Sequence, residues 1–169
     1  MVVEDCSFET ERLVVEGWHL AAVESLPAVV AGMLTPAVTR SLPPDWGGPY
    51  DEARAHRWIA DRDAEGSTLL VSEGRGPVGL VLLHEASVPA GVVVRVGYLL
   101  AEHAWGRGLG GELVEGLVRW CREQASVRSI IGGVAPDNTA SIRVLERNGF
   151  TATTADHASH GEREYRLDL

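Results

Sequence analysis

Residues 105–111 read Trp105-Gly106-Arg107-Gly108-Leu109-Gly110-Gly111, and the interpretation of the whole chain starts from this stretch. Four glycines in seven residues leave much of the segment without side chains, and an apolar helical pattern begins directly after it. Such a loop presents backbone N–H groups to an anion, and the dipole of the following helix adds partial positive charge. The stretch therefore predicts a binding site for a phosphate or pyrophosphate group.

Two well-known phosphate loops fit this stretch poorly. A nucleotide-hydrolase loop ends in Gly-Lys-Ser/Thr, whereas residues 110–112 are Gly-Gly-Glu. The glycines at 106, 108 and 111 match the dinucleotide fingerprint, but that fingerprint joins a strand to a helix early in a βαβ unit. Here the loop follows a run of strand-like segments, and only two helical segments come after it. A different kind of phosphate site and a purely structural glycine turn remain as alternatives.

The spacing of apolar residues predicts a mixed α/β fold with a mostly antiparallel central sheet. We expect about six or seven strands and about four helices. The strands are expected at 11–16, 68–72, 78–84, 92–100, 129–135, 150–153 and 165–168. The helices are expected at 20–34, with a kink or break at Pro27, from the N-cap Asp51 to Glu65, from Leu109 through Trp120, and at 138–148.

Length and composition predict one globular domain over residues 1–169, since 45% of the residues are hydrophobic. No apolar run approaches the ~18 residues of a membrane span, and no secretory leader is visible. We therefore expect a cytoplasmic protein without a membrane partner. The two cysteines, Cys6 and Cys121, are too few for a disulfide framework and lack metal-ligand spacing, so we expect ordinary thiols and no metal.

The net charge of −9 argues against nucleic acid as a partner, because phosphate backbones are bound by basic surfaces. The same charge would attract cationic acceptors such as amines. Solubility alone is the simpler explanation. His157 and His160 flank Ala158-Ser159 in an expected hairpin, without the helical spacing of metal ligands.

Several motifs, in the right order, resemble those of the GNAT N-acetyltransferases. Residues 105–110 look like the family's pyrophosphate loop. Asn138-x-x-Ser141, followed by Val-Leu-Glu-Arg-Asn-Gly-Phe at 144–150, looks like its second conserved block. Glu-Thr-Glu-Arg-Leu at 9–13 and tryptophan at position 105 fit the branch that contains the ribosomal-protein N-terminal (alanine/serine) acetyltransferases.

The resemblance implies where coenzyme A would bind. In this family the strand before the loop splays from a parallel neighbour, and the pantetheine arm occupies the gap. By position, residues 96–100 are that strand and 129–135 the neighbour. The backbone of the splayed strand would then bind the pantetheine arm, and the loop amides would bind the pyrophosphate. The implied acetyl-CoA contacts are Leu99, Leu100, Trp105, Gly106, Arg107, Gly108, Leu109, Gly110, Gly111, Asn138, Ser141 and Arg147.

The resemblance also implies direct attack of a neutral amine on the thioester in a ternary complex. An N–H near Leu100 would stabilise the oxyanion, an effect worth roughly 3 kcal/mol for one donor. Many relatives carry a tyrosine as thiolate acid where this chain has Leu145, so Ser141 or water is expected to donate. Many relatives carry a glutamate base where this chain has Arg95. His84 is the first candidate to replace it, with an ordinary strand-end histidine as the alternative.

The acceptor side is less well defined by sequence. Trp46, Arg95 and Tyr98 are the candidates to contact the acceptor, although Tyr98 could instead fill the core. The acceptor is expected to be a primary amine, either a protein N-terminus or a small molecule. A non-catalytic acyl-CoA-binding module of the same fold is the alternative function. A homodimer formed through the tail, residues 151–169, is also possible by resemblance.

Overall fold

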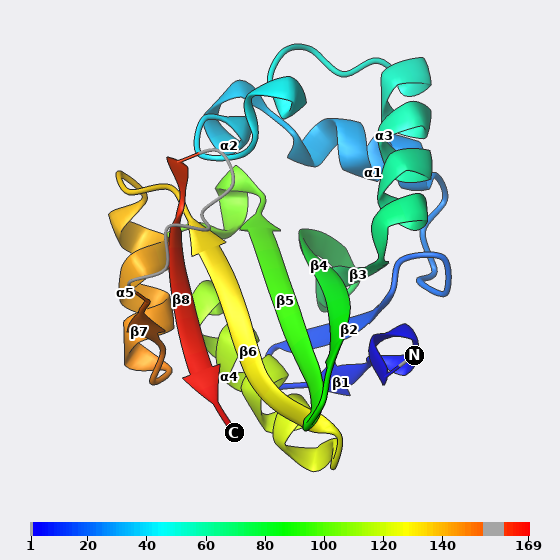
Figure 1. Ribbon diagram of the computed structural model, residues 1–169. Helices are drawn as coiled ribbons and strands as arrows, with labels where there is room; N and C mark the ends of the chain where they lie inside the picture. Colours follow the sequence, from blue (N-terminus) through cyan, green and yellow to red (C-terminus); the bar gives the residue numbers. More distant parts are fainter. Residues whose placement is uncertain (1, 154–160) are drawn as a thin grey trace.

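A single mixed sheet organises the computed structural model, which describes residues 2–153 and 161–169 (Figure 1). The predicted hairpin around His157 and His160 lies outside the described residues. The strands are β1 (Phe8–Glu9), β2 (Leu13–Gly17), β3 (Ser67–Glu73), β4 (Gly76–Val88), β5 (Gly91–Leu100), β6 (Val127–Val134), β7 (Thr151–Ala152) and β8 (Arg163–Asp168). The helices are α1 (Leu26–Met33), α2 (Pro36–Thr39), α3 (Glu52–Glu65), α4 (Leu109–Glu123) and α5 (Thr139–Arg147), with short 3-10 turns η1 (Val2–Asp5), η2 (Pro44–Trp46) and η3 (Glu102–Ala104).

The described strands form an eight-stranded sheet in the order β1-β2-β3-β4-β5-β6-β8-β7. All neighbours are antiparallel except β5 and β6, which run parallel. Their pairing starts at Val92↔Val127 and ends at Val96↔Gly132, whereas β5 stays paired with β4 as far as Leu100. The two parallel strands therefore separate toward their carboxyl ends, as Figure 1 shows. The predicted splayed pair is confirmed.

Two hydrophobic clusters hold helices against opposite faces of this sheet. The larger cluster joins α4 and α5 to β4, β5 and β6, and the predicted stripe of α4 is buried in it. Cys6 and Cys121 lie in this cluster as free thiols. The smaller cluster joins α1 and α3 to Leu70, Leu80 and Leu99. Because α1 and α3 cover only part of their face, the sheet near the separated strands is left accessible.

The helical expectation for residues 20–34 was wrong in its first part. Helix α1 begins only at Leu26, with the side chain of Ser25 accepting a hydrogen bond from the N–H of Ala28. Pro27 lies in the first turn, where its missing N–H has no helical partner to lose. Proline therefore starts this helix instead of breaking it. The N-cap predicted at Asp51 is confirmed, since its side chain accepts from the N–H of Arg54.

The structure has more elements than expected because several are very short. Strands β1 and β7 have two residues each, and α2 has four. Such segments carry too little periodicity to be predicted from apolar spacing. None of the described helices combines the length and the apolar character that a membrane-spanning segment requires.

Replacing Leu113 by alanine should strongly destabilise the fold. Its side chain is 1% exposed inside the larger cluster, so truncation leaves a cavity and should lower the free energy of unfolding by about 2–5 kcal/mol. Leu20→Ala is the matched control, because Leu20 is 80% exposed and its loss should change stability by less than about 0.5 kcal/mol. Urea unfolding followed by circular dichroism measures both. Equal losses in the two variants would contradict this assignment of the core.

Candidate functional site

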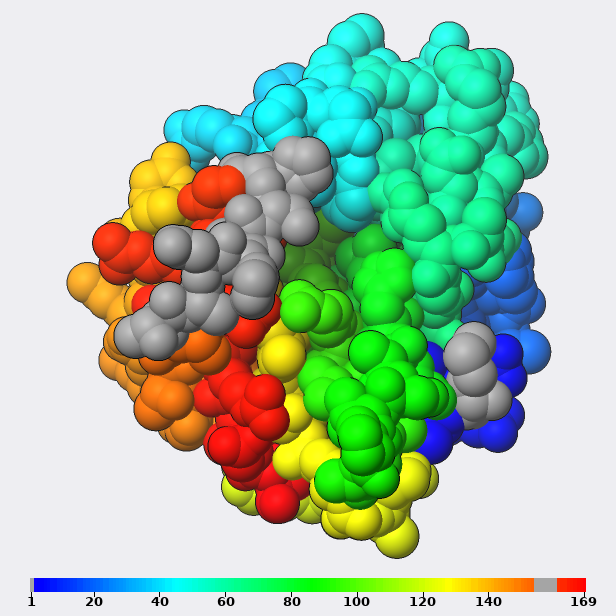
Figure 2. Space-filling model, in the orientation of Figure 1, coloured from blue at the N-terminus to red at the C-terminus, as the bar shows by residue number. Residues whose placement is uncertain are grey.

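Two cavities meet where β5 and β6 separate. The first, of about 270 Å³, lies on the partly covered face of the sheet and is here called the sheet-face cavity. The second, of about 390 Å³, lies beside the glycine-rich loop and is here called the loop-side cavity. Figure 2 shows the first face hollowed between the green strands β4 and β5 and the cyan segment around η2. The residues that line both cavities are Ser41, Leu42, Tyr98, Leu99, Asn138 and Ser141.

The glycine-rich loop forms the N-terminal end of α4 as the sequence predicted. Gly106 and Gly108 have φ angles of 71° and 77°. Residues with a Cβ atom rarely adopt this left-handed region, whereas glycine adopts it readily. Gly108 occupies the N-cap position, and no side chain caps this end of the helix. The first N–H groups of α4 therefore have no helical or side-chain partner among the described residues. Together with the helix dipole, they form a site suited to a phosphate.

Side chains from the N-terminal segment, Thr10 and Arg12, hold the start of α4 and the loop in place. The Arg12 guanidinium donates to Glu112 at 2.6 Å and to the carbonyl of Arg107 at 2.9 Å. Burial alone would raise the pKa of Glu112, but hydrogen bonds from Thr10 and Arg12 lower it below its ordinary value. The side chain of Arg107 is itself paired with Glu73 at 2.7 Å. The acid at the start of α4 is thus neutralised by protein groups, and the loop amides stay free to meet an anion.

The edge of β5 presents alternate backbone groups to the gap between the strands. The N–H of Ala101 donates to Val78 on the β4 side, while the N–H of Val92 donates toward β6, to Ser126. By the alternation of an antiparallel ladder, even-numbered residues direct their backbone groups into the gap. Tyr98 and Leu100 are the two that lie beyond the last parallel pair.

Among the backbone contacts implied for coenzyme A, Leu100 therefore faces the gap and Leu99 does not. Leu99 is in register with Leu80 on β4, and only its side chain reaches the two cavities. The carbonyl of Leu100 accepts a hydrogen bond of 2.8 Å from the indole of Trp105. The N–H of Leu100 keeps its direction into the gap. The difference between Leu99 and Leu100 follows from the alternation of backbone groups along β5, which the sequence pattern did not reveal.

A pair of hydroxyl groups occupies the junction of the two cavities. Tyr98 Oη lies 2.9 Å from Ser141 Oγ. Asn138 caps α5, with its side-chain oxygen accepting from the N–H of Ser141 at 3.1 Å. Burial raises the pKa of Tyr98 above its ordinary value, and the hydrogen bond with Ser141 only partly opposes this. Tyr98 is therefore a neutral hydroxyl at physiological pH, able to donate a proton.

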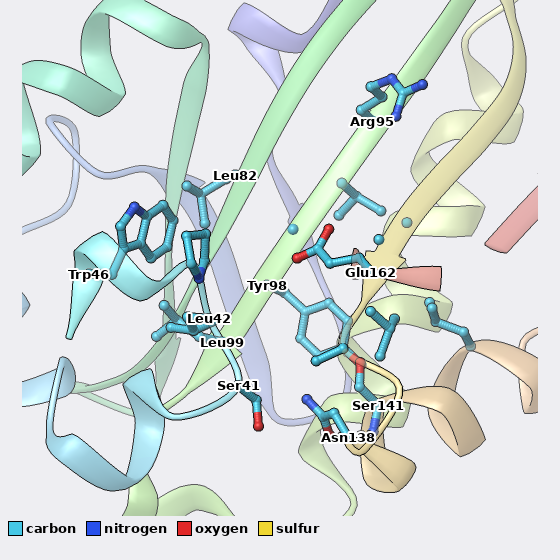
Figure 3. A pocket seen from close by; sticks show the side chains of 18 of the residues that line it. Ser41, Leu42, Trp46, Leu82, Arg95, Tyr98, Leu99, Asn138, Ser141 and Glu162 are labelled. Carbon is cyan, nitrogen blue, oxygen red and sulfur yellow. Dashed lines mark hydrogen bonds between the residues drawn. The ribbon is translucent and has the colours of Figure 1, made fainter. Parts of the chain in front are cut away.

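The sheet-face cavity combines an apolar wall with a carboxylate. Leu42, Trp46 and Leu82 form the apolar wall, and Figure 3 shows the Glu162 carboxylate directed into the cavity near Tyr98. A Cβ placed on Gly133 would collide with Glu162 Oε2, so the carboxylate lies directly against the backbone of β6. Gly133 is the first residue of β6 beyond the last pair with β5, which places Glu162 at the start of the gap.

Glu162 was missed by sequence reasoning. It belongs to no motif, and its position depends on the register of β8 against β6, in which Gly133 pairs with Glu164. The glycine itself was a possible signal, because a glycine inside a strand often marks a close approach of another group. The partner of that approach could not be identified without the long-range pairing.

His84 and Arg95 line the outer part of the same cavity. They are paired with each other across β4 and β5, three residues before Tyr98 and therefore about 10 Å along the strand. His84 Nδ1 donates to the carbonyl of Glu65 at 2.9 Å. Arg95 is paired with Glu164 at 3.4 Å. Both predicted residues thus reach the cavity, but neither lies at the junction.

The wall around Trp46 is fixed by a buried cation. The Arg62 guanidinium lies 4.7 Å from the centroid of Trp46 and 5.3 Å from that of Trp58, and it donates to Glu65 at 2.6 Å. The two indoles meet edge to face at 5.0 Å. Trp58 is a core residue and Trp46 lines the sheet-face cavity.

Arg147, the remaining candidate, lies away from both cavities. It is an exposed residue in the last turn of α5, whereas Asn138 and Ser141 are at the opposite end of the helix. Among the described residues there is no cluster of three or more His, Cys, Asp or Glu side chains that could hold a metal ion.

Comparison with known families accounts for this geometry. The model of the acetyltransferase (GNAT) domain matches residues 12–151, and the chain belongs to this family. The chain is thus a single GNAT domain with the α/β architecture that its motifs predicted. Among curated protein sequences, none matches it.

Several solved structures share the fold. An acetyltransferase from Agrobacterium tumefaciens is 24% identical with a TM-score of 0.73, over 97% of this chain and 95% of that chain. A putative ribosomal-protein-serine acetyltransferase from Vibrio cholerae is 16% identical with a TM-score of 0.73, over 98% and 99%. RimL, a ribosomal L7/L12 alpha-N-protein acetyltransferase in complex with coenzyme A, is 17% identical with a TM-score of 0.70, over 95% and 96%. Identities this low establish the fold alone.

Two glycines of the loop should respond in opposite ways to alanine. Gly108→Ala forces a side chain into a left-handed conformation and should lower the free energy of unfolding by about 1–2 kcal/mol. Gly111→Ala lies in the first turn of α4 with open space around the new Cβ, and should be neutral or stabilising by up to about 1 kcal/mol. Urea denaturation compares them. A Gly108→Ala variant as stable as the parent would show that the loop does not need this conformation.

Proposed function

We propose that this chain is an acetyl-CoA-dependent N-acetyltransferase that acts on a primary amine. The observation that carries the proposal is the junction of the two cavities at Tyr98 and Ser141, inside the gap between β5 and β6. One cavity runs from this point to the phosphate site of the glycine-rich loop, and the other opens on the far side of the sheet. Donor and acceptor can therefore reach one point from opposite directions.

The loop-side cavity fits coenzyme A in its chemistry. The amides of residues 107–111 would hold the pyrophosphate at the positive end of α4. The N–H of Tyr98 would bind an amide carbonyl of the pantetheine arm, and the side chains of Val38 and Val144 line its apolar path. Acetyl-CoA supplies the reactive thioester when bound. The N–H of Leu100 is the proposed donor to the oxyanion that forms during attack.

Glu162 is the proposed group that accepts the proton of the attacking amine. Its carboxylate lies at the start of the gap, whereas His84, the base expected from sequence, lies farther out along β4. Ser141, at the junction, is placed to return a proton to the departing thiolate. Glu162 and Ser141 would thus supply the base and the acid that many relatives carry at the positions of Arg95 and Leu145.

The acceptor is proposed to be a cationic amine. The Glu162 carboxylate is directed into the sheet-face cavity, and the chain carries a net charge of −9, whereas the Glu65 carboxylate is already paired with Arg62. Trp46 and Tyr98 offer aromatic surface in the same cavity, and Arg95 stands at the outer end. A protein N-terminus and a small amine both meet this description. The fold similarity to ribosomal-protein acetyltransferases supports the former.

The alternative is a module that binds acyl-CoA without catalysis. It is favoured by one observation, that Arg95 and Leu145 stand where many relatives carry the base and the acid. Arginine stays protonated and cannot accept a proton, and leucine has no proton to donate, so neither can take a proton-transfer role.

Calorimetric titration should show saturable acetyl-CoA binding, and a panel of peptides and small amines should yield thiol release with at least one acceptor. Glu162→Gln should then lower kcat by about 100-fold or more, the usual effect of removing a general base. His84→Gln is the matched control on the same cavity wall and should have a much smaller effect. Absence of acetyl-CoA binding would overturn the proposal. Binding without release of thiol across the panel would favour the non-catalytic module.

A further inference from the structure

We propose that the hydroxyl of Tyr98 is the proton source for the departing CoA thiolate, and that Ser141 Oγ delivers this proton. The inference rests on the proposed function, because it assigns a role within the same site. The sequence had left two roles open for Tyr98, packing in the core and contact with the acceptor.

The position of the hydroxyl pair is the first argument. Tyr98 and Ser141 are 2.9 Å apart, and each lines both cavities. Their shared location is the point at which a thioester held on one side would meet an amine entering from the other. The capping bond from Asn138 fixes the first turn of α5, so Ser141 Oγ is held at this junction.

The origin of the two side chains is the second argument. Tyr98 lies two residues beyond Val96, where the parallel pairing ends, and its side chain crosses the gap to reach α5. Leu145, farther along α5, is buried and has no proton to donate. Strand β5, through Tyr98, therefore supplies the hydroxyl that α5 lacks at Leu145.

Acidity is the third argument. An isolated serine hydroxyl is a far weaker acid than a thiol, so Ser141 alone is poorly matched to protonate a thiolate. A phenol, with an ordinary pKa of about 10, is much closer to a thiol of about 8.5, and proton transfer is most effective between matched groups. Burial raises the pKa of Tyr98, which keeps its proton in place at neutral pH until the thiolate forms.

The protons of the whole step balance. The cationic amine first loses one proton to solvent, and the neutral nitrogen then forms its bond to the acyl carbon and loses a second proton to Glu162. The carbon–sulfur bond breaks with its electron pair on sulfur. Ser141 Oγ–H protonates the sulfur, and Tyr98 Oη–H replaces the proton on Ser141. The tyrosinate is restored from solvent, which also takes the proton from Glu162. No oxidant, reductant or metal is required.

The test uses CoA binding and therefore needs no known acceptor. If the hydroxyl pair hydrogen-bonds the thiolate, the bound thiol has a lowered pKa. CoA affinity should then increase as the pH rises above the lowered pKa of the bound thiol, and it should level off above the ordinary thiol pKa of about 8.5. Below the lowered pKa this increase in affinity is absent. Dethio-CoA, which has no thiol, corrects for every other titrating group. Calorimetry from pH 6.5 to 9.5 measures both ligands.

We expect the ratio of dethio-CoA to CoA dissociation constants to rise about tenfold over this range in the parent protein, which corresponds to one pKa unit. In Tyr98→Phe and in Ser141→Ala the rise should fall below about twofold. Ser41→Ala is the matched control: it removes another hydroxyl that lines both cavities, and the tenfold rise should remain.

Each other outcome has a definite meaning. A full tenfold rise in Tyr98→Phe, or no rise in the parent, overturns the proton-source role. Equal weakening of CoA and dethio-CoA without a change in the pH dependence would show that the pair only holds α5 against β5, and also overturns it. If neither ligand binds the parent protein, the proposed function fails as well. With an accepted amine, Tyr98→Phe should lower kcat at least tenfold and leave the KM for acetyl-CoA within about twofold.

Discussion

The end of the parallel pairing between β5 and β6, at Val96 and Gly132, is the constraint on which the rest of the site depends. Backbone groups inside a protein need hydrogen-bond partners, and a strand edge that loses its neighbour must find others. Here the indole of Trp105 satisfies the carbonyl of Leu100, while the N–H groups of Tyr98 and Leu100 face the gap. A ligand with amide groups could complete this edge. The binding site is thus an interrupted β-ladder.

The elements around the gap each contribute one kind of group. Helix α4 brings backbone amides, helix α5 brings Asn138 and Ser141, and β5 brings Tyr98. The opposite wall depends on Arg62, whose guanidinium lies over the rings of Trp46 and Trp58 and is paired with Glu65. Both rings attract the cation, which helps to hold the two edge-to-face indoles in their arrangement. This arrangement sets the position of the Trp46 wall of the cavity.

Local sequence signals predicted the elements on which these groups lie. The stripe of α4, the cap at Asp51 and the glycine-rich loop follow from side-chain periodicity and backbone chemistry within a few residues, and the motif order located the separated strands. Ser25 before Pro27 was also a readable signal for the start of α1, but the apolar spacing from Leu20 obscured it. Two features of the site could not be obtained in this way. The side to which Leu99 and Leu100 turn their backbone depends on strand register, and Glu162 reaches the gap only through the pairing of β8 with β6.

The two cavities differ in the parts of the chain that line them. Most residues that line the loop-side cavity come from β5, the glycine-rich loop and the first half of α5, between Tyr98 and Val144, and the others lie within residues 37–42. The sheet-face cavity adds Trp46 of η2, residues of β4, β5 and β6, and Glu162, which lie far apart in the sequence. Substitution of Trp46 or Leu82, which line only the sheet-face cavity, can change the shape of that cavity while the glycine-rich loop and the hydroxyl pair stay unaltered. The apolar wall that would select an amine can therefore vary independently of the groups proposed to bind coenzyme A.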